Sequence, residues 1–149
     1  MLLQPALLDD VWEFPVGFFY DYPGHRRHLQ LGACSNAEME HVLMQAWQAG
    51  WHSVVLVSHS HELIHRPHHF SEPVRANQTV IRRFDRLCRF LMQHSDKFNT
   101  AGFSASNPVA LPAQEALTAL RSGVRRTALR MLEQATSRFR DAKIFNPSV

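Results

Sequence analysis

The sequence predicts an α/β fold in which a parallel sheet is followed by a C-terminal helical segment. Strand-like and helix-like patterns alternate along the first 105 residues, which is typical of parallel sheets. Residues 54–57 form a continuous apolar run of three valines and one leucine, as expected for a strand buried on both faces. Beyond residue 112 only helical patterns remain. We therefore expect two parts, a β/α domain over residues 1–105 and a basic helical tail over residues 106–149.

The first half of the chain supplies most of the predicted strands. Residues 11–16 (VWEFPV) read as a short strand that enters a proline, and residues 18–20 continue as an extended aromatic stretch. Residues 21–24 (DYPG) are a turn signal, since proline sets φ near −65° and glycine accepts positive φ. A helix is predicted from Ser35, which forms a capping box with Glu38, to Gly50, a natural residue to end it.

The second half is predicted to be mainly helical. Asn77 can cap a helix with an apolar stripe from Val80 to Met92 that includes Cys88. Residues 98–103 are a candidate strand, and residues 104–112 read as a linker. Two further helices are expected, at residues 112–122 and 124–142, separated by Gly123.

Composition excludes several classes of protein. The 149 residues carry a net charge of +3, with residues 1–104 at −1 and residues 105–149 at +4. An Arg-rich tail of this kind either binds nucleic acid or forms a solvated helix face, and the absence of a nucleic-acid motif favours the solvated face. Two cysteines cannot form a disulfide framework, and no apolar run is long enough to cross a membrane. With no secretory signal at Met1, we expect a cytoplasmic protein.

Two histidines directly follow the apolar run at residues 54–57. His59 and His61 flank Ser60, so an extended chain would place both imidazoles on one side. Such a pair can bind a metal or share acid–base work, because histidine titrates near neutral pH. An ordinary polar strand end is an equally good interpretation. Glu62 could orient an imidazole, or it could be a surface carboxylate.

The turn at residues 21–28 is a second candidate. Tyr22, His25 and Arg26 crowd this turn and could hold a sugar ring or an anionic group, although a solvated loop explains them as well. The other chemical groups are weaker candidates. His65, His68 and His69 lie at loose spacing, Asp9-Asp10 precedes a strand, and Ser60 lacks the G-x-S-x-G pattern of a nucleophile.

Several stretches together resemble the C-terminal half of a polysaccharide deacetylase of the NodB-homology type. They are Glu13-Phe14-Pro15-Val16 before an aromatic turn, the helix from Ser35 to Gly50, and the apolar run that ends in His59-Ser60-His61-Glu62-Leu63. The resemblance covers about residues 10–105. It implies that the expected parallel sheet is a partial, distorted (β/α) barrel-like sheet, followed by the C-terminal helical segment. It also implies hydrolysis of acetyl groups from a glycan. It also makes His59 the general acid that protonates the departing amine or alcohol, with Tyr22, His25, Arg26, His61 and Glu62 as substrate-binding candidates.

The resemblance also implies a divalent metal such as zinc, held by one aspartate and two histidines, with a second aspartate as base. The family places these residues in an Asp-Asp-Gly strand end and a His-x-x-x-His motif of the N-terminal half. Here Val11 follows Asp9-Asp10, and the His61/His65 spacing comes too late in the chain. We therefore expect no metal ligands in this chain, a partner that supplies the missing half or a second copy, and no activity alone. The alternative is a non-enzymatic module that binds a glycan, or nucleic acid through the Arg-rich helices.

Overall fold

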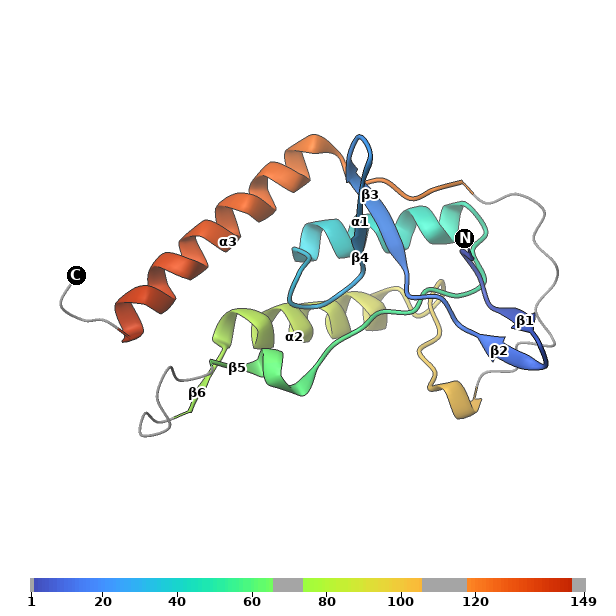
Figure 1. Cartoon of the computed structure of the whole chain (residues 1–149), viewed down its shortest axis with the longest axis horizontal. Coiled ribbons are helices and arrows are strands. Elements are labelled where there is room, and N and C mark those ends of the chain that lie inside the picture. Colours follow the sequence, from blue (N-terminus) through green and yellow to red (C-terminus); the bar gives the residue numbers. More distant parts are fainter. Residues whose placement is uncertain (1, 66–73, 106–117, 146–149) are drawn as a thin grey trace.

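The computed structural model describes residues 2–65, 74–105 and 118–145. A hairpin, β3 (Phe18–Tyr22) and β4 (His25–His28), lies against helix α1 (Asn36–Gln48), and helix α2 (Gln78–Gln93) lies on the other side of α1 from the hairpin's tip. Helix α3 (Val124–Phe145) begins beside β3 and extends away from the body toward the C-terminus (Figure 1).

Within the part of the chain that the structure describes, three two-stranded sheets make up the regular sheet structure. Strand β1 (Ala6–Leu8) pairs with β2 (Val11–Glu13), β3 pairs with β4, and β5 (Ile64–His65) pairs with β6 (Arg75–Ala76), all antiparallel. The described residues also include two 3₁₀ helices, η1 (Ser60–Leu63) and η2 (Phe103–Ala105).

The prediction of a barrel-like parallel sheet is wrong. In the described residues parallel pairing is limited to isolated bridges, Val16 with Val55, Gln30 with Val57 and Tyr20 with Arg121. Only two residues, Pro23 and Gly24, separate Tyr22 from its partner His25, and so short a loop can join strands only in antiparallel order. Residues 54–57 are half-buried and meet their neighbours at two positions, so they do not form the central strand of a sheet.

Two extended segments nevertheless flank the β3–β4 hairpin. On the β4 side, Leu31 N donates to Val57 O at 3.0 Å, and Val57 N donates to Leu29 O at 2.9 Å. On the β3 side, Tyr20 N donates to Leu120 O and Ser122 N donates to Tyr20 O, each at 2.9 Å. The helix predicted for residues 112–122 is therefore wrong in its described part, because residues 118–122 are extended and bonded to β3.

The helices follow the capping signals more closely. Ser35 and Glu38 form the predicted capping box, and Gly50 has a positive φ of 70° just beyond α1. The Asn77 side chain accepts from Val80 N at the start of α2. The strand predicted at residues 98–103 is not formed, and most of the predicted linker at residues 104–112 lies outside the described residues.

The apolar core lies where the β3–β4 hairpin packs against α1 and α2. Its buried members are Phe19, Leu29, Leu31, Cys34, Met39, Val42, Leu43, Ala46, Val80, Leu87 and Leu120. Leu120 joins this core although it is far from the other members in the sequence, so residues 118–122 belong to the packed body. The division at residues 105 and 106 stays a prediction.

Candidate functional site

The first candidate group follows residues 54–57. His59 is the extended residue before η1, and His61 lies within η1. Both side chains are exposed, and their rings stack with centroids 5.1 Å apart and planes only 10° apart. The predicted side-by-side placement of the two imidazoles is therefore found, although a 3₁₀ turn rather than an extended strand produces it.

Glu62 holds this turn against the end of β4. Its carboxylate accepts from the Gln30 side-chain amide, and its backbone N donates to His59 O at 3.0 Å. Gly32 lies directly under the carboxylate, since a Cβ at that position would be 2.9 Å from Glu62 Oε1. The half-buried Glu62 therefore contacts Gln30 and Gly32 and fixes the backbone that carries His59.

The second candidate group lies at the β3–β4 turn. The Tyr22 and His25 rings stack with centroids 4.5 Å apart and planes 12° apart. The Arg26 guanidinium lies 6.0 Å from the centre of the Phe18 ring. Tyr22 and His25 thus present a flat aromatic pair at the tip of the hairpin.

These two groups are not brought together. The β3–β4 turn projects at the top of the view in Figure 1, whereas β5, which directly follows η1, lies at the lower left beside α2. Tyr22, His25 and Arg26 therefore do not share a pocket with His59 and His61 in this chain. A substrate that contacts both groups would need to be extended.

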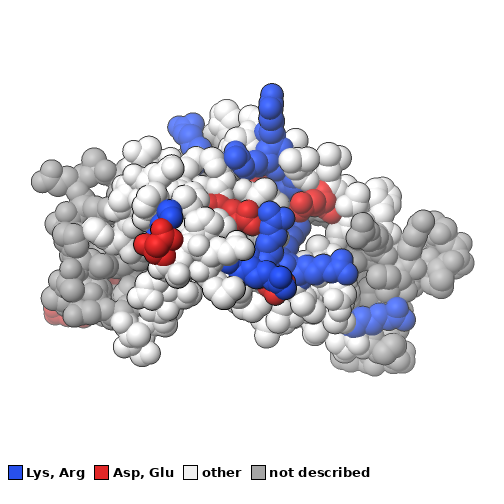
Figure 2. Space-filling model, turned by 180° about the vertical axis from the view of Figure 1, so that it is seen from behind, with Lys and Arg blue, Asp and Glu red and all other residues white. Residues whose placement is uncertain are grey.

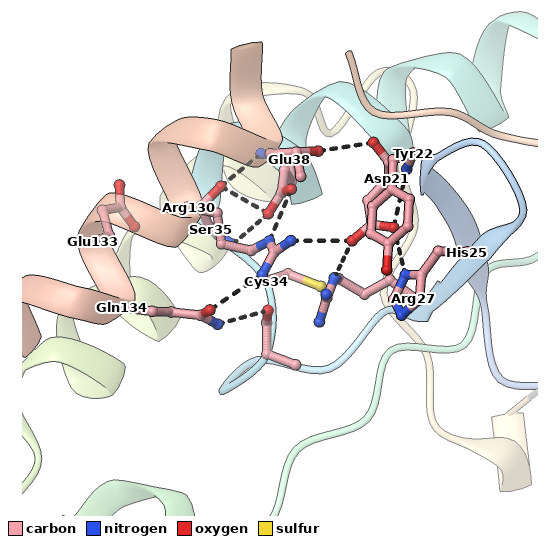
Figure 3. Close-up of polar contacts among 12 residues, drawn as sticks. Asp21, Tyr22, His25, Arg27, Cys34, Ser35, Glu38, Arg130, Glu133 and Gln134 are labelled. Atoms are coloured by element: carbon pink, nitrogen blue, oxygen red, sulfur yellow. Dashed lines mark hydrogen bonds and ion pairs between the residues drawn. The ribbon is translucent and has the colours of Figure 1, made fainter. Parts of the chain in front are cut away.

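A buried cluster of charges lies behind the β3–β4 turn (Figure 3). Arg130 of α3 is 2% exposed and bridges two buried carboxylates, with Nη2 at 3.0 Å from Asp21 Oδ2 and Nε at 3.1 Å from Glu38 Oε1. Arg27 Nε lies 2.8 Å from Asp21 Oδ2, and His25 Nδ1 lies 2.6 Å from Asp21 Oδ1. The cluster joins β3, β4, α1 and α3.

The surroundings of Asp21 favour its charged form. Burial alone would raise the pKa of this carboxyl, but hydrogen bonds from His25 and Arg27, together with their charges, outweigh burial and hold the pKa below its ordinary value. Ser35 adds to the cluster, since its backbone N donates to Glu38 Oε2 at 3.0 Å. Because every charge here has a partner of opposite sign, the cluster serves to hold the elements together.

Sequence reasoning missed the Asp21–Arg130 contact. The two residues are 109 positions apart, and neither lies in a motif that names the other. The capping box did identify Glu38, but that signal says only that the carboxylate reaches back to Ser35.

The basic residues bear on the predicted nucleic-acid alternative. Figure 2 shows Lys and Arg side chains gathered near the middle of one face with acidic side chains beside them. Some arginines of the chain form ion pairs. Arg86 Nε lies 2.8 Å from Glu40 Oε1, and Arg83 Nη2 lies 3.2 Å from Glu133 Oε2. Arg130 is buried, so it is not available to a phosphate backbone.

The remaining sequence candidates are placed as follows. Asp9 and Asp10 form the exposed β1–β2 turn with positive φ values, and His65 lies in β5. His68 and His69 lie outside the described residues. Cys34 is buried, and burial raises its pKa to about 11. Cys88 lies on the apolar stripe predicted for α2 and was therefore expected to be buried, but it is exposed.

The described residues, 2–65, 74–105 and 118–145, lack the set of donors that a metal needs. No group of three or more His, Cys, Asp or Glu side chains in these ranges could hold a metal ion. The stacked His59 and His61 rings supply two nitrogen ligands at most, so the described residues do not fit the divalent metal that the resemblance implies. In the same ranges no helix is long and apolar enough to span a membrane.

Comparisons with protein-family models, with curated proteins and with solved structures found no match.

Proposed function

We propose that this chain contributes a proton-donating histidine to the removal of acetyl groups from a glycan. His59 would be the general acid. Water adds to the acetyl carbonyl carbon and gives a proton to a base that would come from outside the described residues. The bond from that carbon to the sugar nitrogen or oxygen breaks, and the imidazolium of His59 gives its proton to the leaving amine or alcohol. The products are acetate and the deacetylated sugar.

The exposed, stacked pair of His59 and His61 at the end of residues 54–57 carries this proposal. A general acid needs an accessible proton and a fixed position, and Glu62 supplies the second requirement by bonding Gln30 and capping η1. His61 would contact the sugar, since its ring lies against that of His59. The divalent metal and the base that the resemblance implies would come from outside the described residues. The proposed proton transfer from His59 to the leaving group requires no contact between His59 and either of them.

The test uses fully N-acetylated chitotetraose and an O-acetylated xylo-oligosaccharide as probes. We expect at least one of them to shift the imidazole Cε1–H resonances of His59 and His61 in NMR spectra of the whole chain. Acetate release in the presence of Zn²⁺ or Co²⁺ is measured in parallel. Where release is detected, His59→Gln should lower it by about 10²-fold or more, the range typical of a lost general acid.

His52→Gln is the matched control, because His52 is an exposed histidine in the turn after α1. This variant should leave both readouts unchanged. If neither probe shifts His59 and no acetate is released, the proposal fails. Equal losses in His59→Gln and His52→Gln would also contradict it.

A further inference from the structure

The apolar side of α3 faces solvent. Val124, Met131, Leu132 and Phe139 are 73%, 51%, 63% and 73% exposed. Exposed Ala128 and Ala135 lie between them. Their spacing of three and four residues places all six on one side of the helix. We call these six residues the α3 apolar stripe.

The opposite side of α3 is polar and holds the helix to the body. Thr127 is buried and its hydroxyl donates to Asp21 O at 3.0 Å, while Arg130 binds Asp21 and Glu38. Farther along, Glu133 pairs with Arg83 of α2 at 3.2 Å. The helix cannot rotate to bury the α3 apolar stripe without taking Arg130 away from the two buried carboxylates, Asp21 and Glu38. The stripe is therefore fixed in its outward position.

The size of this surface fits a protein partner. Its exposed apolar side chains amount to on the order of 500 Å², at the upper end of what an ordinary monomer leaves open. Two such surfaces in contact would bury about 1,000 Å² in total, which reaches the lower limit for a specific interface.

The order of residues along the stripe is self-complementary in the antiparallel sense. About a two-fold axis between Met131 and Leu132, Val124 of one copy meets Phe139 of the other, and Ala128 meets Ala135. The central contact is then Met131 against Leu132. Because alanine faces alanine on both sides of the centre, the two helix axes can approach closely while the larger side chains fill the middle and the ends.

We propose that the α3 apolar stripe binds a second copy of this chain through an antiparallel α3–α3 contact around a two-fold axis. Such an isologous contact uses the same patch on both copies. Because the contact uses only residues of α3, the proposal does not depend on the role of His59.

Sedimentation equilibrium of the whole chain tests the association. We expect the apparent mass to rise with concentration from 17.1 kDa toward twice that value. Leu132→Glu should raise the dissociation constant at least tenfold, with unchanged helix content by circular dichroism. Met92→Glu is the matched control, because Met92 is a 70% exposed apolar residue on α2, and it should associate like the wild type. A wild-type chain that stays monomeric at 100 µM would overturn the proposal.

Cysteine cross-linking tests the geometry in a Cys88→Ser background. Leu132→Cys should form a disulfide-linked dimer readily, because the two-fold axis brings its two copies together. Val124→Cys alone should not, since its two copies would lie about 22 Å apart along the helix axis. A mixture of Val124→Cys and Phe139→Cys chains should cross-link. Efficient linking of Val124→Cys to itself would contradict the antiparallel pairing.

A lipid surface is the competing occupant and has its own outcome. The whole chain is floated with vesicles of phosphatidylcholine and phosphatidylglycerol. Binding that Leu132→Glu abolishes, found together with a monomer in solution, would assign the stripe to a membrane and overturn the self-association. Absence of flotation together with dimerisation supports the proposal.

Discussion

At the scale of single residues, Arg130 has the largest effect that we expect from any substitution. It pairs with Asp21 and Glu38, both of which are buried. Arg130→Met should lower the free energy of unfolding by about 3–5 kcal/mol, because it removes the paired cation from buried Glu38 and one of the cations that pair with buried Asp21. Urea unfolding followed by circular dichroism measures the loss. Arg125→Met, at an exposed position of the same helix, should stay within about 0.5 kcal/mol of the wild type. Similar losses in the two variants would show that the ion pairs do not matter.

The charge on Asp21 predicts a dependence of stability on pH. The pKa of Asp21 is lower in the folded chain than its ordinary value, so the stability it contributes is complete above the unfolded pKa of about 3.9. That contribution is lost as the pH falls through the lower, folded value. Asp21→Asn should therefore be less stable than the wild type at pH 7, and the difference should shrink toward pH 2. Urea unfolding across this range checks it, and a difference that stays constant with pH would contradict the assignment.

The two thiols should react very differently. Cys88 is exposed, whereas Cys34 is buried and its pKa is raised to about 11. Only the thiolate reacts with a disulfide reagent such as DTNB. One equivalent should therefore react quickly in the native chain, and the second only on unfolding. Cys88→Ser should abolish the fast phase, while a fast phase that survives in Cys88→Ser would mean that Cys34 is accessible.

At this scale, contacts between residues close together in the sequence could be predicted, and contacts between residues far apart in the sequence could not. Ser35 and Glu38 are three residues apart, so the capping box follows from local geometry alone. Arg130 reaches Asp21 only because α3 returns to β3, and nothing near Arg130 in the sequence encodes that return. The placement of His59 and His61 on one side was predicted because they are near neighbours in the chain, but the prediction assumed an extended chain and gave no stacking of the rings.

At the scale of secondary structure elements, the β3–β4 turn depends on one backbone conformation. Gly24 has φ of +80° and open space around the position where a Cβ would stand. Gly24→Ala should lower the free energy of unfolding by about 1 kcal/mol through backbone strain alone. Gly102 also has open space, but its φ is outside the positive range, so Gly102→Ala should be neutral or slightly stabilising. Thermal unfolding compares the two, and equal effects would exclude the turn conformation as the cause.

The elements that the sequence predicted well have local signals at their ends. Helices α1 and α2 begin at Ser35 and Asn77, which are polar caps. Strand β4 was read as part of a loop, because its four residues (HRRH) carry no apolar pattern. The helix over residues 124–142 was predicted correctly, but its apolar side lies in solvent while Arg130 and Thr127 face the body. Periodicity identifies a helix without saying which side packs inward.

At the scale of the whole molecule, the prediction of a parallel sheet was wrong because strand order depends on contacts between distant segments. Residues 54–57 do reach β4, and residues 118–122 do reach β3, but each makes only a few backbone hydrogen bonds. The composition of the apolar run fits either a central strand or such a short flanking segment. The sequence therefore predicted a mixture of helices and strands, and it did not predict their arrangement.

This arrangement predicts where the molecule resists opening. The amides of Tyr20, Leu31, Val57 and Ser122 donate to carbonyls of distant segments around the buried hairpin, so they should exchange with solvent only through large-scale unfolding. Among the described strands, β1 and β2 pair with each other alone, and they expose Leu7, Leu8 and Val11, so their amides should exchange through local opening. Hydrogen exchange followed by NMR separates the two classes, and we expect protection at least 10²-fold greater in the first. Equal protection in β1–β2 would mean that the stable body includes this hairpin, and that the β3–β4 hairpin with its two flanking segments is not the centre of the fold.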